Sequence, residues 1–178
     1  MRKLNKNREN IINIRCLERK EAPYMLEWMH DESVIKYMNT DFSSMTVDDC
    51  ISFIQDSKDG THNLHLAIVD SNDEYQGTVS LKDIDYEKKQ AEFAIAIRRC
   101  AMGKGFSSAA MKMIIDYGFE KIDLNRIYWY VSPDNVRALK FYDKNGYERT
   151  ICFNQTCDEK KYVWYLIEKC PNQTHKMM

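Results

Sequence analysis

The sequence is poor in the residues that separate a chain into modules. It has three prolines and six glycines in 178 residues, with no internal repeat and no low-complexity tract. Because no linker divides it, one domain is expected over residues 10–170, with loosely held polar ends at residues 1–9 and 171–178. A chain of this length can bury a core without disulfides or metals.

Long apolar runs and a strong net charge are also absent. No stretch of about 18 consecutive apolar residues occurs, so a membrane-spanning helix is not expected. The formal net charge is −1, although 30% of the residues are charged, so no overall field favours nucleic acid or an anionic membrane. A small or locally recognised substrate fits this balance better than a polyanion.

The six cysteines show no paired spacing: they are Cys16, Cys50, Cys100, Cys152, Cys157 and Cys170. The basic N-terminus has no apolar stretch before Ile11, so it does not match a secretory signal. Reduced thiols and a cytoplasmic location are therefore expected. Cys152 and Cys157 are close, but no second pair of Cys or His completes four ligands, so no metal site is expected.

Hydrophobic periodicity predicts a mixed α/β fold. Helical spacing predicts helices over residues 20–29 and 32–38, from Thr46, from Gly105, and from Asp134 to Asn145-Gly146. Strand patterns occur at residues 11–17, 63–70, 75–84, 90–97, 126–131, 147–153 and 161–167. Thr46 and Asp134 are the expected N-caps, and Asn145-Gly146 is an expected left-handed stop. This order predicts one mixed (α+β) sheet with helices packed on it, and neither a bundle nor a barrel.

A glycine-bearing corner connects the strand at residues 90–97 to the helix that follows. Gly103 and Gly105 let backbone N–H groups approach phosphate oxygens, and the helix dipole favours negative charge there. Lys104, Ser107 and Ser108 could add charge or hydrogen bonds. The alternative is an ordinary turn that needs glycine for its backbone angles. The spacing matches neither a Walker A loop nor a three-glycine dinucleotide fingerprint.

Two blocks of the sequence resemble the signatures of the GNAT N-acetyltransferases. The loop from Met102 resembles the first signature, Gln/Arg-x-x-Gly-x-Gly/Ala, and residues 124–148 resemble the second. The order of elements from residue 11 to 168 also resembles this family, with the closest likeness to the branch that includes ribosomal-protein alanine acetyltransferases. Met102 stands where the family usually has Gln or Arg, and Ser107 where it usually has Gly or Ala. The resemblance implies a mostly antiparallel sheet of about seven strands, with a splayed strand pair that holds CoA.

The resemblance also implies which residues bind acetyl-CoA, the co-substrate of this family. A backbone amide on the strand before the loop is expected to face the thioester carbonyl, and the loop amides to face the diphosphate. Asn135 matches a position that contacts the pantetheine arm, with helix capping as the alternative. The expected cofactor-binding residues are Ile95, Ala96, Ile97, Met102, Gly103, Lys104, Gly105, Phe106, Ser107, Asn135, Phe141 and Tyr142.

Two side chains are candidates for the acid–base chemistry of amide formation. Tyr142 matches the position where the family often has the general acid for the leaving thiolate, and the alternative is packing beneath the cofactor. Glu92 stands where several relatives place a carboxylate that activates water or amine, and the alternative is an edge-strand charge that faces solvent. His65 is interpreted as a satisfied core or surface histidine.

The acceptor is expected near the early helices and the last two strands, at Trp28, Tyr37 and Phe42, together with Phe153 and Asn154. This lining has few carboxylates and does not demand a polycation, whereas an amino sugar, free or nucleotide-linked, or a peptide N-terminus fits it. The predicted function is acetyl-CoA-dependent N-acetylation of a primary amine by a monomer or homodimer. Two alternatives are a catalytically weak acyl-CoA-binding sensor or structural module, and nucleotide-phosphate binding by the same loop.

Overall fold

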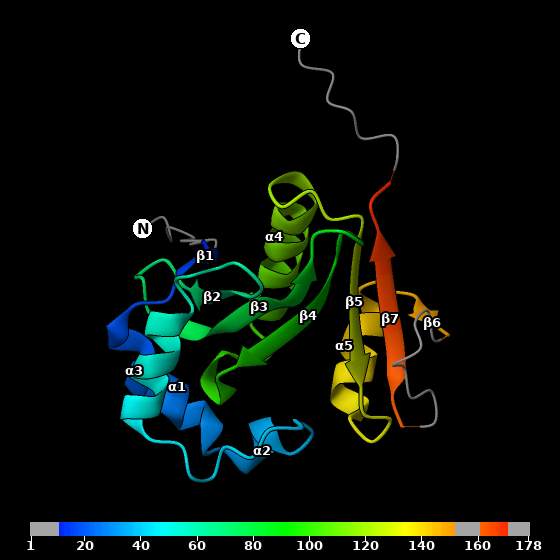
Figure 1. Ribbon diagram of the computed structural model, residues 1–178. Helices are drawn as coiled ribbons and strands as arrows, with labels where there is room; N and C mark the ends of the chain where they lie inside the picture. Colours follow the sequence, from blue (N-terminus) through cyan, green and yellow to red (C-terminus); the bar gives the residue numbers. More distant parts are fainter. Residues whose placement is uncertain (1–10, 152–160, 171–178) are drawn as a thin grey trace, which may run out of the picture.

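A seven-stranded sheet forms the centre of the computed structural model, which describes residues 11–151 and 161–170 (Figure 1). Its strands are β1 Asn13–Cys16, β2 Leu64–Val69, β3 Tyr75–Asp85, β4 Gln90–Ile97, β5 Arg126–Val131, β6 Arg149–Thr150 and β7 Val163–Glu168. The spatial order is β1-β2-β3-β4-β5-β7-β6. Within the described strands, β4 and β5 pair in parallel and the other neighbours pair antiparallel. The predicted mixed, mostly antiparallel sheet is confirmed.

Helices cover both faces of this sheet. The described helices are α1 Ala22–Met29, α2 Glu32–Ile35, α3 Val47–Asp56, α4 Phe106–Glu120 and α5 Val136–Lys144, with short 3-10 turns at Arg19–Glu21 and Arg99–Ala101. In Figure 1, α4 and α5 lie behind the sheet, whereas α1 and α3 lie in front of its first strands. No helix in the described ranges has the length and apolar character of a membrane span.

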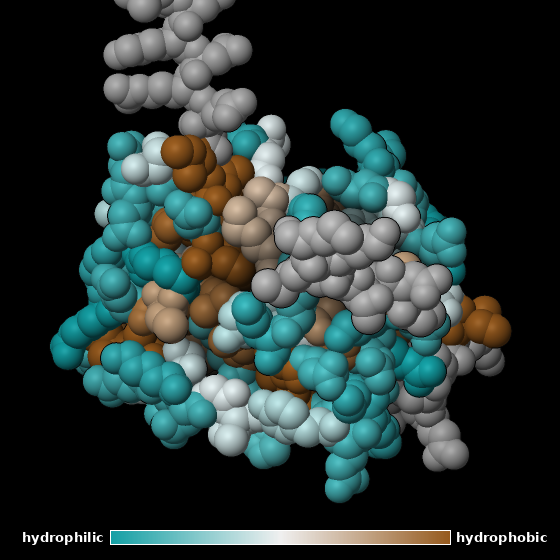
Figure 2. Space-filling view, turned by 90° about the horizontal axis from the view of Figure 1, so that it is seen from above, coloured by the Kyte–Doolittle hydropathy of each residue, from teal (hydrophilic) through white to brown (hydrophobic). Residues whose placement is uncertain are grey.

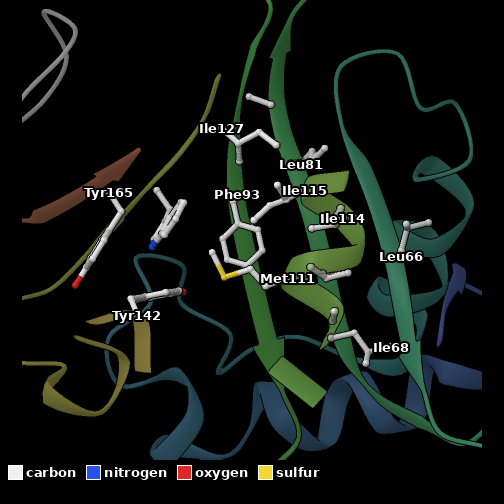
Figure 3. Close-up of a cluster of buried hydrophobic side chains, with 14 of the residues drawn as sticks. Leu66, Ile68, Leu81, Phe93, Met111, Ile114, Ile115, Ile127, Tyr142 and Tyr165 are labelled. Atoms are coloured by element: carbon white, nitrogen blue, oxygen red, sulfur yellow. The ribbon is translucent and has the colours of Figure 1, made fainter. Parts of the chain in front are cut away.

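Successive residues of a strand point into two different cores. Val79, Leu81, Phe93 and Ile127 are buried with Met111 and Ile114 of α4 on one face, part of which Figure 3 shows. On the other face, Ala67 and Val69 are buried with residues of α1 and α3. Seen from above, hydrophilic side chains cover most of the surface, and hydrophobic residues gather in a narrower strip (Figure 2). The alternation fixes which face each site residue can reach.

The helix caps confirm one sequence prediction and correct another. Thr46 caps α3 as expected: its hydroxyl accepts the N–H of Asp49, whose side chain accepts the N–H of Thr46. The cap of α5 is Asn135 rather than Asp134, because the Asn135 Oδ1 accepts the Ala138 N–H at 3.1 Å. Gly146 follows α5 with φ of 80°, as a left-handed stop requires.

Several elements are shorter than the sequence suggested. The first strand covers Asn13–Cys16, and the second helix ends at Ile35. The first helix begins at Ala22, because the preceding residues form a 3-10 turn. The predicted strand at 147–153 is a strand at Arg149–Thr150. The rest of that prediction beyond residue 151, and the predicted loose ends at residues 1–9 and 171–178, lie outside the described residues.

We expect Gly77→Ala to destabilise the protein strongly. A methyl group at this β3 position would overlap the Ala96 carbonyl oxygen and press on the Ile97 Cα at 3.0 Å, both of which are backbone atoms of β4. Because the backbone of β4 cannot move away, this overpacking should lower the free energy of unfolding by about 2–3 kcal/mol. Urea denaturation measures this loss.

Gly118→Ala is the matched control. Its added methyl group would meet the ends of side chains, at 3.0 Å from Ile127 and 3.1 Å from Leu81, and α4 gains from a better helix former. An equal loss of stability in both variants would show that the approach of β3 to β4 at Gly77 is not special.

Candidate active site

The site begins where β4 and β5 separate. Their parallel pairing joins Gln90 to Arg126 and ends with Glu92 opposite Tyr128. Beyond that point β3 still pairs with β4 as far as Ile97, and β7 still pairs with β5 as far as Val131. The facing edges of β4 and β5 therefore have no ladder partner among the described strands, and they leave main-chain polar groups for a ligand. The expected splayed strand pair is confirmed.

The loop after β4 has the backbone geometry that a diphosphate requires. Gly103 and Gly105 have φ of 74° and 88°, and nothing lies within 4 Å of the place where a Cβ would stand on either. No side chain caps α4, so the N–H groups of its first turn have no partner in the helix. The open glycine surface and these amides fit an anionic phosphate group. Contacts of Lys104 and Ser107 with the phosphates stay predictions.

The unusual Met102 points inward. Its side chain is half-buried and packs against both hydrophobic cores. The Arg137 Nη1 atom, from α5, lies 2.9 Å from the Met102 sulfur, and Nη2 lies 3.5 Å from the Ser33 carbonyl oxygen. Phe106 is also a core residue, with 4% of its surface exposed. The Met102 N–H is also engaged, by the Arg99 carbonyl oxygen at 3.3 Å, whereas Phe106 begins α4 and its N–H has no partner within the helix.

Tyr142 of α5 packs on the α4 face of the sheet, against the strands that separate. Its ring is buried, and its centroid lies 5.2 Å from that of Trp129 and 5.1 Å from that of Tyr165. Trp129 in turn contacts Phe93 of β4 edge to face, so the phenol belongs to the cluster that joins β4 to β5 (Figure 3). Burial, and then the nearby Tyr165, raise the pKa of Tyr142 above its ordinary value. The phenol therefore keeps its proton at neutral pH.

Asn135 and Phe141 stand on the same helix. The Asn135 Oδ1 is engaged as the N-cap of α5, so the capping alternative describes what this oxygen does. Phe141 is half-buried and contacts the Tyr142 ring edge to face at 5.1 Å. Contacts of either side chain with the pantetheine arm stay predictions.

Glu92 lies on the opposite face of the sheet, and its solvent-facing alternative is wrong. Its side chain is only 14% exposed and forms an ion pair with Lys82, with 2.6 Å between Nζ and Oε1. His65 lies on the same face, with its Nδ1 atom 2.7 Å from the Ser80 hydroxyl. Burial, and then the charge of Lys82, lower the pKa of His65 to about 4, so the imidazole is neutral at pH 7. A carboxylate, an ammonium and a neutral imidazole therefore share this face.

The residues expected to bind the acceptor differ in how buried they are. Trp28 is buried, donates its indole N–H to the Tyr75 hydroxyl at 3.0 Å and contacts Phe42 edge to face. This placement favours a core role for Trp28. Tyr37 is 36% exposed and Phe42 is half-buried. Phe153 and Asn154 lie outside the described residues.

Sequence reasoning missed a row of aromatic residues beside Glu92. Tyr128 and Tyr130 of β5 share a face with Trp164 of β7, and Tyr162 precedes β7. The Tyr130 ring lies 4.8 Å from Tyr162 and 4.9 Å from Trp164, measured between centroids. The sequence does show aromatic residues at alternate positions in two predicted strands. It does not show the register in which these strands pair. We call these four residues the aromatic row.

Comparison with known proteins identifies the class. The family described as Acetyltransferase (GNAT) domain matches residues 12–148. The uncharacterized N-acetyltransferase p20 of Bacillus licheniformis is 35% identical over 141 residues, 78% of this chain and 79% of that protein. The spermidine N(1)-acetyltransferase of Escherichia coli K12 is 29% identical over 136 residues, 76% of this chain and 72% of that protein. The chain belongs to the GNAT family.

Solved structures agree with this assignment. The spermidine N-acetyltransferase from Vibrio cholerae in complex with CoA and spermine superimposes with a TM-score of 0.73 at 20% identity, over 88% of this chain and 95% of that one. The predicted GNAT fold is thus confirmed, and the protein is an N-acetyltransferase with acetyl-CoA as its co-substrate. The ribosomal branch is represented by the putative ribosomal N-acetyltransferase YdaF of Bacillus subtilis, which is 30% identical over 40% of this chain.

Gly105→Asp should weaken CoA binding. The added carboxylate would stand in the open space beside the first amides of α4 and would repel the diphosphate. We expect the dissociation constant for CoA to rise about 10-fold or more, measured by titration calorimetry.

Gly60→Asp is the control, because Gly60 also has a positive φ, of 57°, and its Cβ would meet only the Lys58 carbonyl oxygen at an ordinary 3.9 Å, but it lies after α3, away from the loop. An unaltered CoA affinity in the Gly105 variant, or an equal loss in both variants, would contradict the assignment of the loop.

Proposed function

We propose that this enzyme transfers the acetyl group of acetyl-CoA to a primary amine of a small molecule that approaches on the Glu92 face of the sheet. The observation that carries the proposal is the arrangement of two side chains around the strand separation. Tyr142 lies in the cluster on the α4 and α5 face, and Glu92 points to the opposite face at the last paired position of β4. A thioester held between the strands would lie between a proton donor and a proton acceptor.

The bound thioester supplies an activated acyl group, and the chain supplies orientation and proton transfers. Main-chain N–H groups among Ile95, Ala96 and Ile97 that face β5 can donate to the carbonyl oxygen as negative charge develops there. Glu92 accepts the proton that the amine loses as the C–N bond forms, directly or through one water. Tyr142 donates its phenolic proton to the sulfur as the C–S bond breaks.

A polyamine is the second candidate acceptor. The supporting observation is that relatives from Escherichia coli and Vibrio cholerae are spermidine N(1)-acetyltransferases. An amino sugar or a protein N-terminus, which the sequence suggested, has no such relative by name apart from the putative ribosomal acetyltransferase YdaF. A structural neighbour from Vibrio cholerae is dodecameric, whereas we retain a monomer or homodimer as the prediction for this chain.

Turnover with a panel of amines tests the proposal. Purified protein with acetyl-CoA is offered hexosamines, simple monoamines, spermidine and short peptides, and release of the CoA thiol is followed. Acetylation of a small primary amine supports the proposal. Normal CoA binding without thiol release for any amine would instead support the alternative of an acyl-CoA sensor.

Tyr142→Phe should slow the chemical step by roughly 10- to 1000-fold with little change in acetyl-CoA binding. The ring packing survives and only the proton is lost. Single-turnover kinetics and calorimetry measure the two quantities. Because the pKa of Tyr142 is raised above its ordinary 10.0, the wild-type kcat should show no alkaline decline from this group below pH 10.

Tyr147→Phe is the control, because it removes a hydroxyl from a ring whose centroid lies 6.1 Å from that of Tyr142 in the same cluster. It should leave kcat within about twofold. An unchanged rate in the Tyr142 variant would remove this residue from the acid role.

Glu92→Gln tests the proton acceptor. The variant keeps the shape of the side chain but loses its charge and basicity, so kcat/KM for the amine should fall by about 10- to 100-fold, with a changed pH profile. Glu168→Gln, which breaks an exposed ion pair with Arg126 at the other end of β5, should have no such effect. If neither the rate nor the pH profile changes, the amine reacts from the neutral fraction already present in solution, and Glu92 has another role.

A further inference from the structure

We infer that Lys82 and the aromatic row select an acceptor that carries one amine on an uncharged ring, such as an amino sugar, and that Lys82 is the residue that disfavours polyamines. This inference rests on the proposed function, because it names the substrate class of the same site. The residues that carry it are Lys82, Glu92 and the aromatic row.

The first step concerns charge at the end of the strand separation. Glu92 is the carboxylate beside the last β4–β5 pair, and Lys82 of β3 lies directly opposite it in register. The two form an ion pair at 2.6 Å, with side-chain exposures of 35% for Lys82 and 14% for Glu92. The one negative charge at this position is therefore already matched by a positive charge.

A polycation binds poorly beside such a pair. Spermidine carries several ammonium groups, and with one amine at Glu92 the next is only three or four methylene groups away, close enough to be repelled by Lys82 in a partly buried setting. The Lys82 ammonium also lies on the same face as His65, whose pKa is lowered by burial and then by the charge of Lys82. A substrate with a single amine avoids this repulsion.

The second step concerns the shape of the surface beside Glu92. Tyr130 and Trp164 are opposite each other in register, and Tyr130 also contacts Tyr162. The adjacent Trp129 contacts Tyr142 of α5, so the alternation of strand residues places the Tyr130 ring on the face away from α5. Tyr128 is the register partner of Glu92 and lies 6.3 Å from Trp164, which joins the row to the carboxylate.

Trp164 is only 6% exposed and packs against the tyrosines of the row, whereas Tyr128, Tyr130 and Tyr162 are half-buried. The three tyrosines offer apolar ring faces with hydroxyl groups at their edges, which suit the C–H faces and hydroxyls of a sugar ring. Tyr162 also donates its hydroxyl proton to Asn39 Oδ1 at 3.0 Å, which ties the chain after α2 to this surface. Aromatic faces attract a cation as well, so the row alone admits either acceptor. The ammonium of Lys82 decides between them.

The experiment compares substrates within each variant, so that any general loss of catalysis cancels. kcat/KM is measured for glucosamine, galactosamine, a ring-bearing monoamine such as benzylamine, and spermidine. The ratio of the best ring-bearing amine to spermidine is the readout. In the wild type it should exceed one, and in Lys82→Gln it should fall by about 10-fold, because the repulsion is lost.

Two control variants test the role of the charge. Lys82→Arg keeps the positive charge and should keep the wild-type ratio. Lys88→Gln removes a lysine that is 72% exposed and paired with Asp85 near the same hairpin, and should also keep it. Tyr130→Leu should lower kcat/KM for the ring-bearing amines by about 10-fold and lower that for spermidine less.

A wild type that prefers spermidine to every ring-bearing amine would overturn the inference, as would a ratio that changes less than twofold in Lys82→Gln. Both results leave the proposed acetyl transfer intact. Failure of that proposal is distinguishable, because no amine of any class would then be acetylated although CoA binds.

Discussion

Parallel pairing between β4 and β5 stops after Glu92 and Tyr128, whereas the outer edges of both strands remain paired with β3 and β7. The two strands are thus held apart by their neighbours instead of relaxing toward each other. Backbone groups on the facing edges stay without ladder partners, a cost that a bound ligand can offset. The proposed place of acetyl-CoA, between Tyr142 on one face and Glu92 on the other, depends on this interruption in the sheet.

The two faces of the separated strands have different chemistry because strand residues alternate. Phe93 and Trp129 point toward α4 and α5 and contact each other edge to face, which places the buried Tyr142 in an apolar, proton-retaining environment. The neighbouring positions on the same strands, Glu92 and Tyr128, point to the other face, where charged and polar groups gather. An offset of one residue along β4 or β5 therefore decides whether a side chain lies on the face of Tyr142 or on the face of Glu92.

The sequence was informative where local chemistry decides the structure. The bounds of β4 and β5 were predicted correctly, and so was the start of α4 after Gly105, because strand-forming residues and a glycine-bearing corner act over a few positions. The cap of α5 was assigned to Asp134 instead of Asn135, since two adjacent residues can both cap and only the backbone path decides. The pairing of Lys82 with Glu92 needed the β3–β4 register, which contains an irregularity between Lys82 and Asp85.

The proposed acceptor surface was the least predictable part for the same reason. Tyr128, Tyr130, Tyr162 and Trp164 come from two stretches of the chain more than 30 residues apart, and they form a surface only because β5 and β7 are neighbours in a particular register. Trp28 looked equally suitable in the sequence, yet its indole N–H is used by Tyr75 inside the core. Aromatic character alone therefore does not locate a binding surface, because a ring buried in the core, like that of Trp28, presents no face to a ligand, whereas half-buried rings such as those of Tyr128 and Tyr130 do.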